Sequence, residues 1–343
     1  MYVSNRIQYR HLIWEALVPI VIATLWSLTV VYLHVFAGLN WVVLPVLPVT
    51  LVGIAVSLYV AFKSASAYNR WWEARTAVGL MVAQSRELVA HSQSFIQPDM
   101  ERPDKKVVKR ILYRHLGWSF LVAHMLRRDS RLKDSPHRRM FSHRCTDVEH
   151  MRVSQHDKSY QEFLAPEECA AAEAFNNPPY YVMLQQAHEL RGLAGAGALD
   201  PNRHVAMVEL LGRLTIAYGV CERIKNTPFP RLMTHFGRLF TWALVFMLPL
   251  AFLDVFEQEA KKHDFSVLLT HEYVFSLVPF SVLISWIFLM MEKVSESHED
   301  PFEGGTNDVP LSAIFRLIEI DVKQALNEKD MPAPVRPVDD TLY

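Results

Sequence analysis

Apolar residues gather in four long stretches of the chain, at 12–36, 41–62, 239–253 and 273–291. About 20 apolar residues in a helix cross a bilayer core of roughly 30 Å. Three of the stretches reach that length, whereas 239–253 reaches it only if it is extended to 236–256. The pattern therefore predicts four membrane spans in two hairpins. For the short stretch, the alternative is a helix buried inside the protein.

Basic residues near the ends of the spans predict their orientation, because short cytoplasmic loops carry an excess of Lys and Arg. The link 37–40 has no basic residue, while the outer ends of the first hairpin carry Arg6, Arg10, Lys63, Arg70 and Arg75. The third span is preceded by Arg223, Lys225, Arg231 and Arg238. Both termini are thus predicted to be cytoplasmic. A signal peptide is not expected, because the first stretch is too long and lacks a small-residue cleavage site.

The residues between the two hairpins, 63–234, have the pattern of amphipathic helices. Apolar side chains recur near helical spacing, for example at Val78, Val82, Leu88 and Phe95. No long run alternates with a period of two, so strands are not expected. Gly and Pro mark loops at "NNPPY" and "GLAGAGALDPN". The predicted fold class is an all-α membrane protein with a large cytosolic helical region.

The remaining boundaries follow from the same pattern. Residues 1–62 hold the N-terminal segment and the first hairpin, and residues 235–291 hold the second. Residues 292–325 are predicted to form a cytosolic helical segment. Residues 326–343 are rich in proline and are expected to be disordered.

Composition agrees with a chain that separates apolar spans from a charged body. Hydrophobic residues make up 51% and charged residues 21%, and the net charge of -1 gives no general attraction to nucleic acid. Cys145, Cys169 and Cys221 have no C-x-x-C spacing. Neither a disulfide framework nor a zinc site is expected from them, and they are interpreted as reduced thiols.

The sequence carries no recognisable catalytic motif. It has no H-E-x-x-H, G-x-S-x-G or phosphate-binding glycine loop. The segment 137–150, "HRRMFSHRCTDVEH", is rich in potential metal ligands, but their spacing matches no standard site, so a solvated loop is expected. We predict no enzyme activity, no cofactor and no bound metal.

The second apolar stretch has one face of particular interest. Ile54, Leu58 and Phe62 recur at i, i+4 and i+8, so they share one side of a helix. One interpretation is a lipid-facing helix, for which any apolar triplet would serve. In the other, several copies of the helix surround an axis, and rings of these side chains form an apolar constriction that gates ions by dewetting.

Three motifs connect this chain to a known family. "FKSASAYNRWWEAR" at 62–75, "VCERIKNTPFP" at 220–230 and "EDPFEGGTNDVPL" at 299–311 occur in this order. In type and spacing they resemble the bestrophin family of ion channels, bacterial branch. The resemblance runs from the first span to about residue 320, and residues 129–161 are extra. Arg70, Trp71, Trp72, Glu73, Arg75, Asp300, Pro301 and Phe302 carry its most specific part.

The resemblance implies a homopentamer around a central pore in a bacterial inner membrane. On the matching positions, Ile54, Leu58 and Phe62 would line an apolar neck. The family's second constriction, in the cytosolic part, falls in the segment matching "TPFP", where Phe229 is the candidate. Pro228 and Pro230 would fix its backbone. The alternative for Phe229 is an ordinary core residue.

The residues after the neck are given structural roles. Trp71 and Trp72 are candidates for anchors at the headgroup level, which indoles favour. Arg70, Glu73 and Arg75 are expected to pair with other helices, or else to be solvated.

One departure from the family pattern concerns calcium. Animal bestrophins hold calcium with a dense acidic run after the matching Pro-Phe. Here Glu299, Asp300, Glu303 and Asp308 are dispersed. Because Ca²⁺ requires six to eight oxygen ligands, calcium gating by this route is not expected.

The function predicted from these observations is a passive channel for monovalent ions. The family name implies chloride, and the bacterial branch leaves monovalent cations open. The expected partners are the permeant ions, the lipid bilayer and further copies of the chain. The alternatives are a secondary transporter, which ordinarily shows inverted repeats, and a membrane-anchored scaffold for a cytosolic partner.

Overall fold

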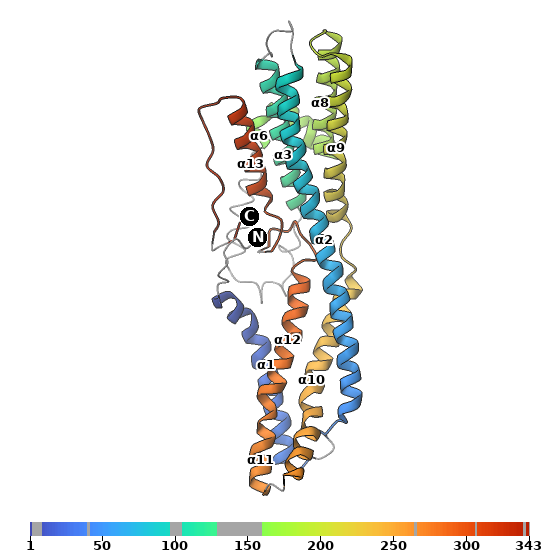
Figure 1. The fold of residues 1–343 in the computed structure, drawn as a ribbon, viewed down its shortest axis with the longest axis vertical. Coiled ribbons are helices and arrows are strands. Elements are labelled where there is room, and N and C mark those ends of the chain that lie inside the picture. The colour runs from blue at the N-terminus through green and yellow to red at the C-terminus, as the bar shows by residue number, and fades with distance from the viewer. Residues whose placement is uncertain are drawn as a thin grey trace. The chain divides into compact units, whose positions relative to one another are not determined.

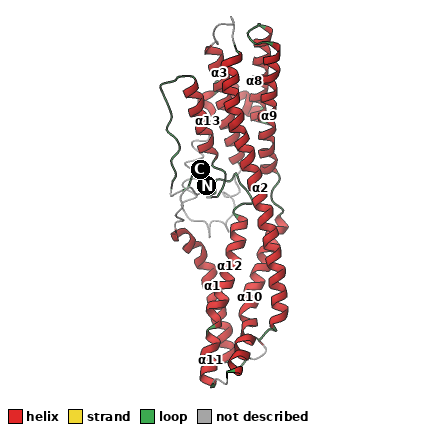
Figure 2. Cartoon of the chain, viewed as in Figure 1, coloured by secondary structure: helices red, strands yellow, loops and turns green. Residues whose placement is uncertain are grey.

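A computed structural model of the chain describes residues 1, 9–39, 42–96, 105–128, 160–263, 266–305, 307–338 and 341–342. Within these ranges all regular structure is helical, apart from one isolated bridge between Val338 and Thr341 (Figure 2). The segment 137–150, and nearly all of the extra residues 129–161, lie outside the described residues.

The chain divides into two compact units. The span unit, as we name it, comprises Arg6–Asn69 and Pro228–Glu299. The body unit comprises Met1–Asn5, Arg70–Thr227 and Asp300–Tyr343. The division between residues 69 and 70 falls inside a single helix, α2 (Val46–Phe95), so the main chain passes from one unit to the other without a break in helical structure.

The span unit contains the first half of α2 and four further helices, α1 (Tyr9–Val35), α10 (Arg231–Lys262), α11 (Val267–Phe275) and α12 (Leu277–Glu296). Helices α1, α10 and α12 lie side by side (Figure 1). One apolar cluster joins α2 to α10 through Val56, Val60 and Leu244, and a second joins α1 to α10 and α11 through Val30, Leu253 and Val274.

The short apolar stretch at 239–253 lies within α10, a helix of 32 residues. The helix extends well beyond the apolar core at both ends, so its length is sufficient for a bilayer. Among the described residues, five helices are long and apolar enough to cross a membrane, namely Leu17–Val35, Val46–Phe95, Pro201–Asn226, Arg231–Lys262 and Leu269–Glu296. The sequence analysis had placed 201–226 in the cytosolic region.

The body unit contains the second half of α2 together with α3 (Lys105–Arg127), α6 (Tyr160–Phe163), α7 (Pro166–Ala174), α8 (Pro178–Gly195), α9 (Pro201–Asn226) and α13 (Leu311–Ala325). These helices bury one large apolar core to which α2, α3, α8, α9 and α13 all contribute. Helix α3 lies in this core and is not among the candidate spans.

The starts of two body helices follow from local sequence. The Asn177 side chain accepts a hydrogen bond from the Tyr180 N–H at 3.1 Å, and the Asp200 side chain accepts one from the Asn202 N–H at 2.9 Å. In both helices proline occupies the first turn, where its missing N–H is not needed. The segments "NNPPY" and "GLAGAGALDPN" therefore end one helix and cap the next.

The segment that follows α13 has no helix in its described part, 326–338. Its predicted disorder stays a prediction, as do the residue boundaries assigned to the predicted regions.

Candidate functional site

The first half of α2 presents an apolar stripe to the outside of the subunit. Ile54 is 55% exposed, Leu58 56% and Phe62 68%. The opposite face of the helix is buried, because Val56 and Val60 pack in the span-unit core. Three large apolar side chains thus project from a single copy in one line, which is where a constriction built from several copies would require them. Their role in a neck stays a prediction.

The residue after Phe62 is a buried charge instead of an exposed apolar side chain. Lys63 is fully buried, and its Nζ lies 2.5 Å from Glu292 Oε1 and 3.2 Å from Glu299 Oε1. The sequence analysis had used Lys63 only as a basic flank that indicates orientation. Its burial was missed because both carboxylates come from the distant end of α12 and the residues after it.

In the body unit, the structure brings together the three motifs that the sequence analysis singled out. The Arg70 guanidinium donates a hydrogen bond to the carbonyl oxygen of Ile224. The Trp71 indole N–H donates to the carbonyl oxygen of Asn307 at 2.8 Å. Residues of "RWWEAR" therefore contact both "VCERIKN" and the segment that contains Asp-Pro-Phe. We call this meeting point the motif junction.

Charged and aromatic side chains extend the motif junction. Glu73 pairs with Arg223 of α9, and the Arg75 guanidinium lies 5.5 Å from the centre of the Trp71 ring. Trp71 is only 9% exposed, whereas Trp72 is 52% exposed. The burial of Trp71 favours a packing role over a headgroup anchor for that indole, and leaves Trp72 as the candidate anchor.

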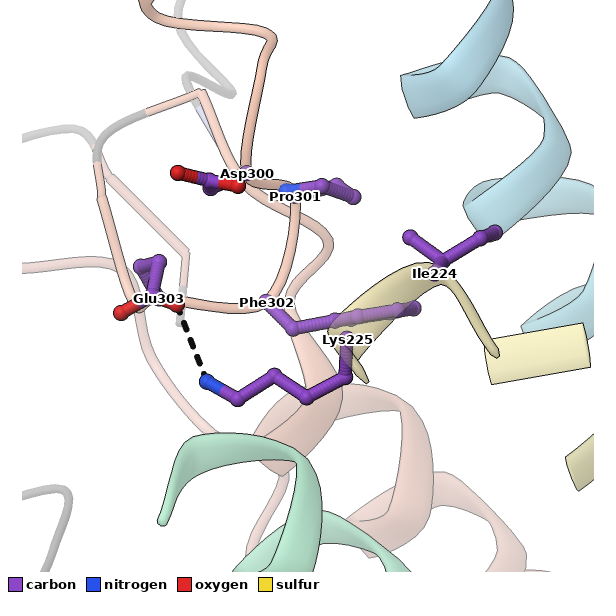
Figure 3. A pocket seen from close by; sticks show the side chains of 6 residues that line it. All are labelled: Ile224, Lys225, Asp300, Pro301, Phe302 and Glu303. Atoms are coloured by element: carbon purple, nitrogen blue, oxygen red, sulfur yellow. Dashed lines mark hydrogen bonds and ion pairs between the residues drawn. The ribbon is translucent and has the colours of Figure 1, made fainter. Parts of the chain in front are cut away.

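The Asp-Pro-Phe turn packs against the end of α9 (Figure 3). Phe302 is 2% exposed, and Lys225 Nζ lies 2.9 Å from Glu303 Oε1. The carbonyl oxygen of Pro301 accepts the Val309 N–H at 3.0 Å, which closes the turn. Gly304 has a φ of 85°, a backbone conformation that favours glycine. The cavity at this turn has a volume of about 10 Å³, room for about one water and for no larger ligand.

Asp308 is a buried carboxylate of the motif junction. It is 5% exposed, and its Oδ2 accepts a hydrogen bond from the Gly305 N–H at 2.9 Å. Burial, with a contribution from the neighbouring Glu303, raises the pKa of Asp308 to about 6, while hydrogen bonds from the backbone amides oppose the shift. Asp308 therefore changes charge within an experimentally accessible pH range.

The raised pKa of Asp308 predicts a pH dependence of stability. The folded state holds this proton more tightly than the unfolded state, so the contribution is present at low pH. It is lost as the pH rises from about 4 to about 6, and the loss is on the order of 2–3 kcal/mol. Asp308→Asn keeps an acceptor for the Gly305 N–H and should remove this part of the dependence. Thermal unfolding of the purified protein at several pH values measures it.

The matched control for this experiment is Asp321→Asn, whose partly exposed carboxylate pairs with Arg86. Wild type and this control should lose stability in parallel over the same pH range. If Asp308→Asn loses as much stability over this pH range as the wild type and the control, Asp308 does not titrate between about pH 4 and pH 6.

The dispersed acidic residues of the Asp-Pro-Phe segment are engaged with protein groups. Glu303 pairs with Lys225, and Asp308 accepts from backbone amides. Among the described residues, no group of three or more His, Cys, Asp or Glu side chains is arranged to hold a metal ion.

If the chain conducts ions, as the resemblance implies, we expect the currents to be insensitive to micromolar calcium on the cytosolic side, because the described carboxylates form no dense set that could replace the water around Ca²⁺. Calcium titration in planar bilayers, with magnesium as the control ion, measures this. Steep and reversible activation by calcium alone would contradict it.

Phe229, the candidate for a second constriction, is 5% exposed in the single chain, while Pro228 and Pro230 on either side are exposed. A side chain that lines an aperture shared by several copies is expected to be open in one isolated copy. The burial of Phe229 thus favours the alternative of a packed residue, and the aperture stays a prediction.

Comparison with known proteins gives a consistent result. A family model described as "Bacterial/Fungal Bestrophin protein" matches residues 8–324. A protein of Mesorhizobium japonicum named voltage-dependent anion channel-forming protein mll4386 is 26% identical over 337 residues, which cover 96% of this chain and 93% of that protein. The Escherichia coli protein YneE, with the same descriptive name, is 25% identical over 84% of this chain and 80% of its own length.

Solved structures show the same fold. The crystal structure of a bacterial bestrophin homologue from Klebsiella pneumoniae superposes with a TM-score of 0.73 at 23% sequence identity. The superposition covers 92% of this chain and 99% of that one.

Proposed function

Because this chain belongs to the bacterial/fungal bestrophin family, we propose that it is a channel for monovalent ions that assembles as a homopentamer. The ion path follows the axis of the pentamer, and the α2 helices of the five copies line its narrowest part. The names of the relatives, voltage-dependent anion channel-forming proteins, make anions the first ions to test. An apolar neck does not itself distinguish the sign of an ion, so monovalent cations are tested beside them.

The observation that carries this proposal is the outward stripe of Ile54, Leu58 and Phe62. In one copy these side chains are more than half exposed, although the opposite face of the helix is buried through Val56 and Val60. Around a shared axis, successive rings of isoleucine, leucine and phenylalanine narrow the path and exclude water when it closes. No catalytic chemistry is required of any residue.

We propose four membrane spans per copy, formed by α1, the first half of α2, α10, and α11 with α12. The mean hydropathy of the apolar 18-residue segment in these helices is 1.9 to 2.2, whereas that of the corresponding segment in α9 is 1.2. Helix α9 also carries charged residues that pair with the second half of α2, including Arg213 with Glu87 at 2.6 Å. These features support a cytosolic position for α9. We place the chain in a bacterial inner membrane, with both termini in the cytoplasm.

Single-channel recording in planar bilayers tests the proposal. Purified protein should elute with the mass of a pentamer, and should produce discrete current steps whose reversal potential under a salt gradient gives the selectivity. A transporter would give flux without steps, and a scaffold would give neither. Either outcome, in protein that is assembled and stable, would contradict the proposed channel function.

A further inference from the structure

Helix α12 turns a row of polar side chains toward the inside of the span unit. Its buried residues are Leu277, Ser281, Ser285, Glu292 and Ser295, of which only the first is apolar. Their spacings of four, four, seven and three residues place them on one face of the helix. The exposed positions of the same helix carry large apolar side chains such as Phe280 and Leu283. A predicted membrane helix with this distribution faces a polar interior.

Helix α10 forms the opposite wall of this interior. The Thr234 hydroxyl lies 3.0 Å from both Glu299 oxygens, and a Cβ at Gly237 would lie 3.3 Å from both Glu292 oxygens. The two helices are therefore antiparallel, because later residues of α10 meet earlier residues of α12. Thr241 follows on the same face of α10 and is 0% exposed. It lies about 6 Å beyond Gly237 along the helix axis, and so deeper in the span unit than Glu292.

Several polar atoms buried along this interface have no hydrogen-bond partner among the described residues. They are Thr241 Oγ1, Ser285 Oγ, Glu292 Oε2 and Ser295 Oγ. Their residues are respectively 0%, 1%, 5% and 2% exposed. We call these four side chains the polar seam. A buried polar atom without a partner is costly, and proteins ordinarily satisfy such atoms with ordered water.

The two ends of the polar seam differ in their access to solvent. At one end Arg238 pairs with Glu296 at 2.8 Å, and their side chains are 52% and 27% exposed. At the other end Ser281 Oγ lies 3.1 Å from Ser27 Oγ of α1. Beyond that pair, Leu277 belongs to the apolar cluster that joins α1 to α10 and α11. Solvent therefore reaches one end of the polar seam, and apolar packing closes the other.

The chemistry of the polar seam suits water better than it suits an ion. A hydroxyl both donates and accepts hydrogen bonds, whereas the Glu292 carboxylate accepts only. Lys63 Nζ lies 2.5 Å from Glu292 Oε1, so its ammonium group disfavours a cation beside it, and the carboxylate disfavours an anion. A small neutral molecule that donates and accepts satisfies all four atoms. The missing side chain of Gly237 keeps room around this ion pair.

We propose that the polar seam binds a short row of water molecules between α10 and α12. The row starts beside the exposed Arg238, donates to Glu292 Oε2 and stops at the apolar cluster that contains Leu277. The ion pair of Lys63 and Glu292 is thereby hydrated, although both side chains are buried. Hydration of the polar seam does not depend on ion conduction, and its path lies inside one subunit, apart from the exposed apolar stripe of α2.

The variant Thr241→Val tests this inference, because valine has nearly the size of threonine and lacks only the hydroxyl. If water binds at Thr241, the variant loses hydrogen bonds of that water, and the melting temperature should fall by a few degrees. Thermal unfolding of purified wild type and variant measures the shift. An unchanged or higher melting temperature would overturn the proposal, since removing an unpartnered hydroxyl from a dry interface is neutral or stabilising.

The matched control is Thr24→Val on α1. The Thr24 hydroxyl donates to the carbonyl oxygen of Ile20 in its own helix at 2.8 Å, so no water is needed to satisfy it. This variant should lower the melting temperature less than Thr241→Val does. Equal shifts in the two variants would show that the Thr241 hydroxyl also bonds within its helix, and the proposal would fail.

An experimental electron-density map of the assembled protein supplies a direct test. At a resolution that shows buried water elsewhere, peaks should lie within hydrogen-bonding distance of Thr241 Oγ1, Ser285 Oγ and Glu292 Oε2, and the peak beside residue 241 should be missing from Thr241→Val. Closely packed side chains with no density between them would overturn the proposal, even in a protein that conducts ions. The same peaks in a protein that passes no current would support the water site while the channel function fails.

Discussion

Replacing Ile54, Leu58 and Phe62 together by alanine is expected to raise the open probability or the single-channel conductance. Alanine rings are wider and admit water more readily, so the dewetted state that blocks ions becomes less stable. The stability of the subunit should change little, because all three side chains are more than half exposed in a single copy. Single-channel recording of wild type and variant in planar bilayers measures the effect.

The matched control is a second exposed apolar triplet, Val21, Leu25 and Leu28 on α1. These side chains are 45%, 60% and 40% exposed, respectively. Their replacement by alanine removes similar apolar surface from another helix, and should leave conductance unchanged. The neck assignment fails if the α2 triplet, in protein that elutes as a pentamer, gives the same currents as the wild type.

The helical pattern of the chain was predictable because it depends on local spacing. Asn177 and Asp200 cap their helices through bonds to residues two or three positions away, and the prolines beside them fit the first turn. The outward stripe of α2 followed from the i, i+4, i+8 spacing of its members. Such features need no knowledge of distant parts of the chain.

The continuity of α2 was less visible in sequence. Hydropathy falls abruptly after residue 62, and the predicted boundary between membrane and cytosolic regions was placed there. The backbone stays helical across this change, because residues 64–69 are compatible with a helix. Helix α2 therefore continues to Phe95. Where a helix passes from lipid into water, the polarity of its side chains changes. The helix itself ends only where breakers such as Gly or Pro occur.

The pairings of the charged and aromatic residues were beyond the sequence. Lys63 had the pattern of a solvated flank, and Trp71 that of an interfacial indole. The structure buries both side chains. This burial could not be predicted, because the partners Glu292, Glu299 and Asn307 lie more than two hundred positions away in the chain. The pentamer, in turn, was implied by the family resemblance and not by any pattern of residues within one copy.

Phe229→Ala is expected to destabilise the protein, because the side chain is 5% exposed and its removal leaves a cavity. Phenylalanine-to-alanine changes in protein cores cost about 3–5 kcal/mol. The melting temperature and the yield of pentamer should both fall, while the relative permeability of the remaining channels among ions of different size stays that of the wild type. All three quantities should be measured on the same preparation.

Leu232→Ala provides the control for Phe229→Ala, since Leu232 is only three positions away and is 70% exposed. It should leave both the melting temperature and the pentamer yield near the wild-type values. A stable pentamer of Phe229→Ala with altered relative permeability would reverse the interpretation. Five phenylalanines would then form the second constriction, and the burial of Phe229 in one copy would have to be relieved on assembly, with the exposed Pro228 and Pro230 holding the backbone in place.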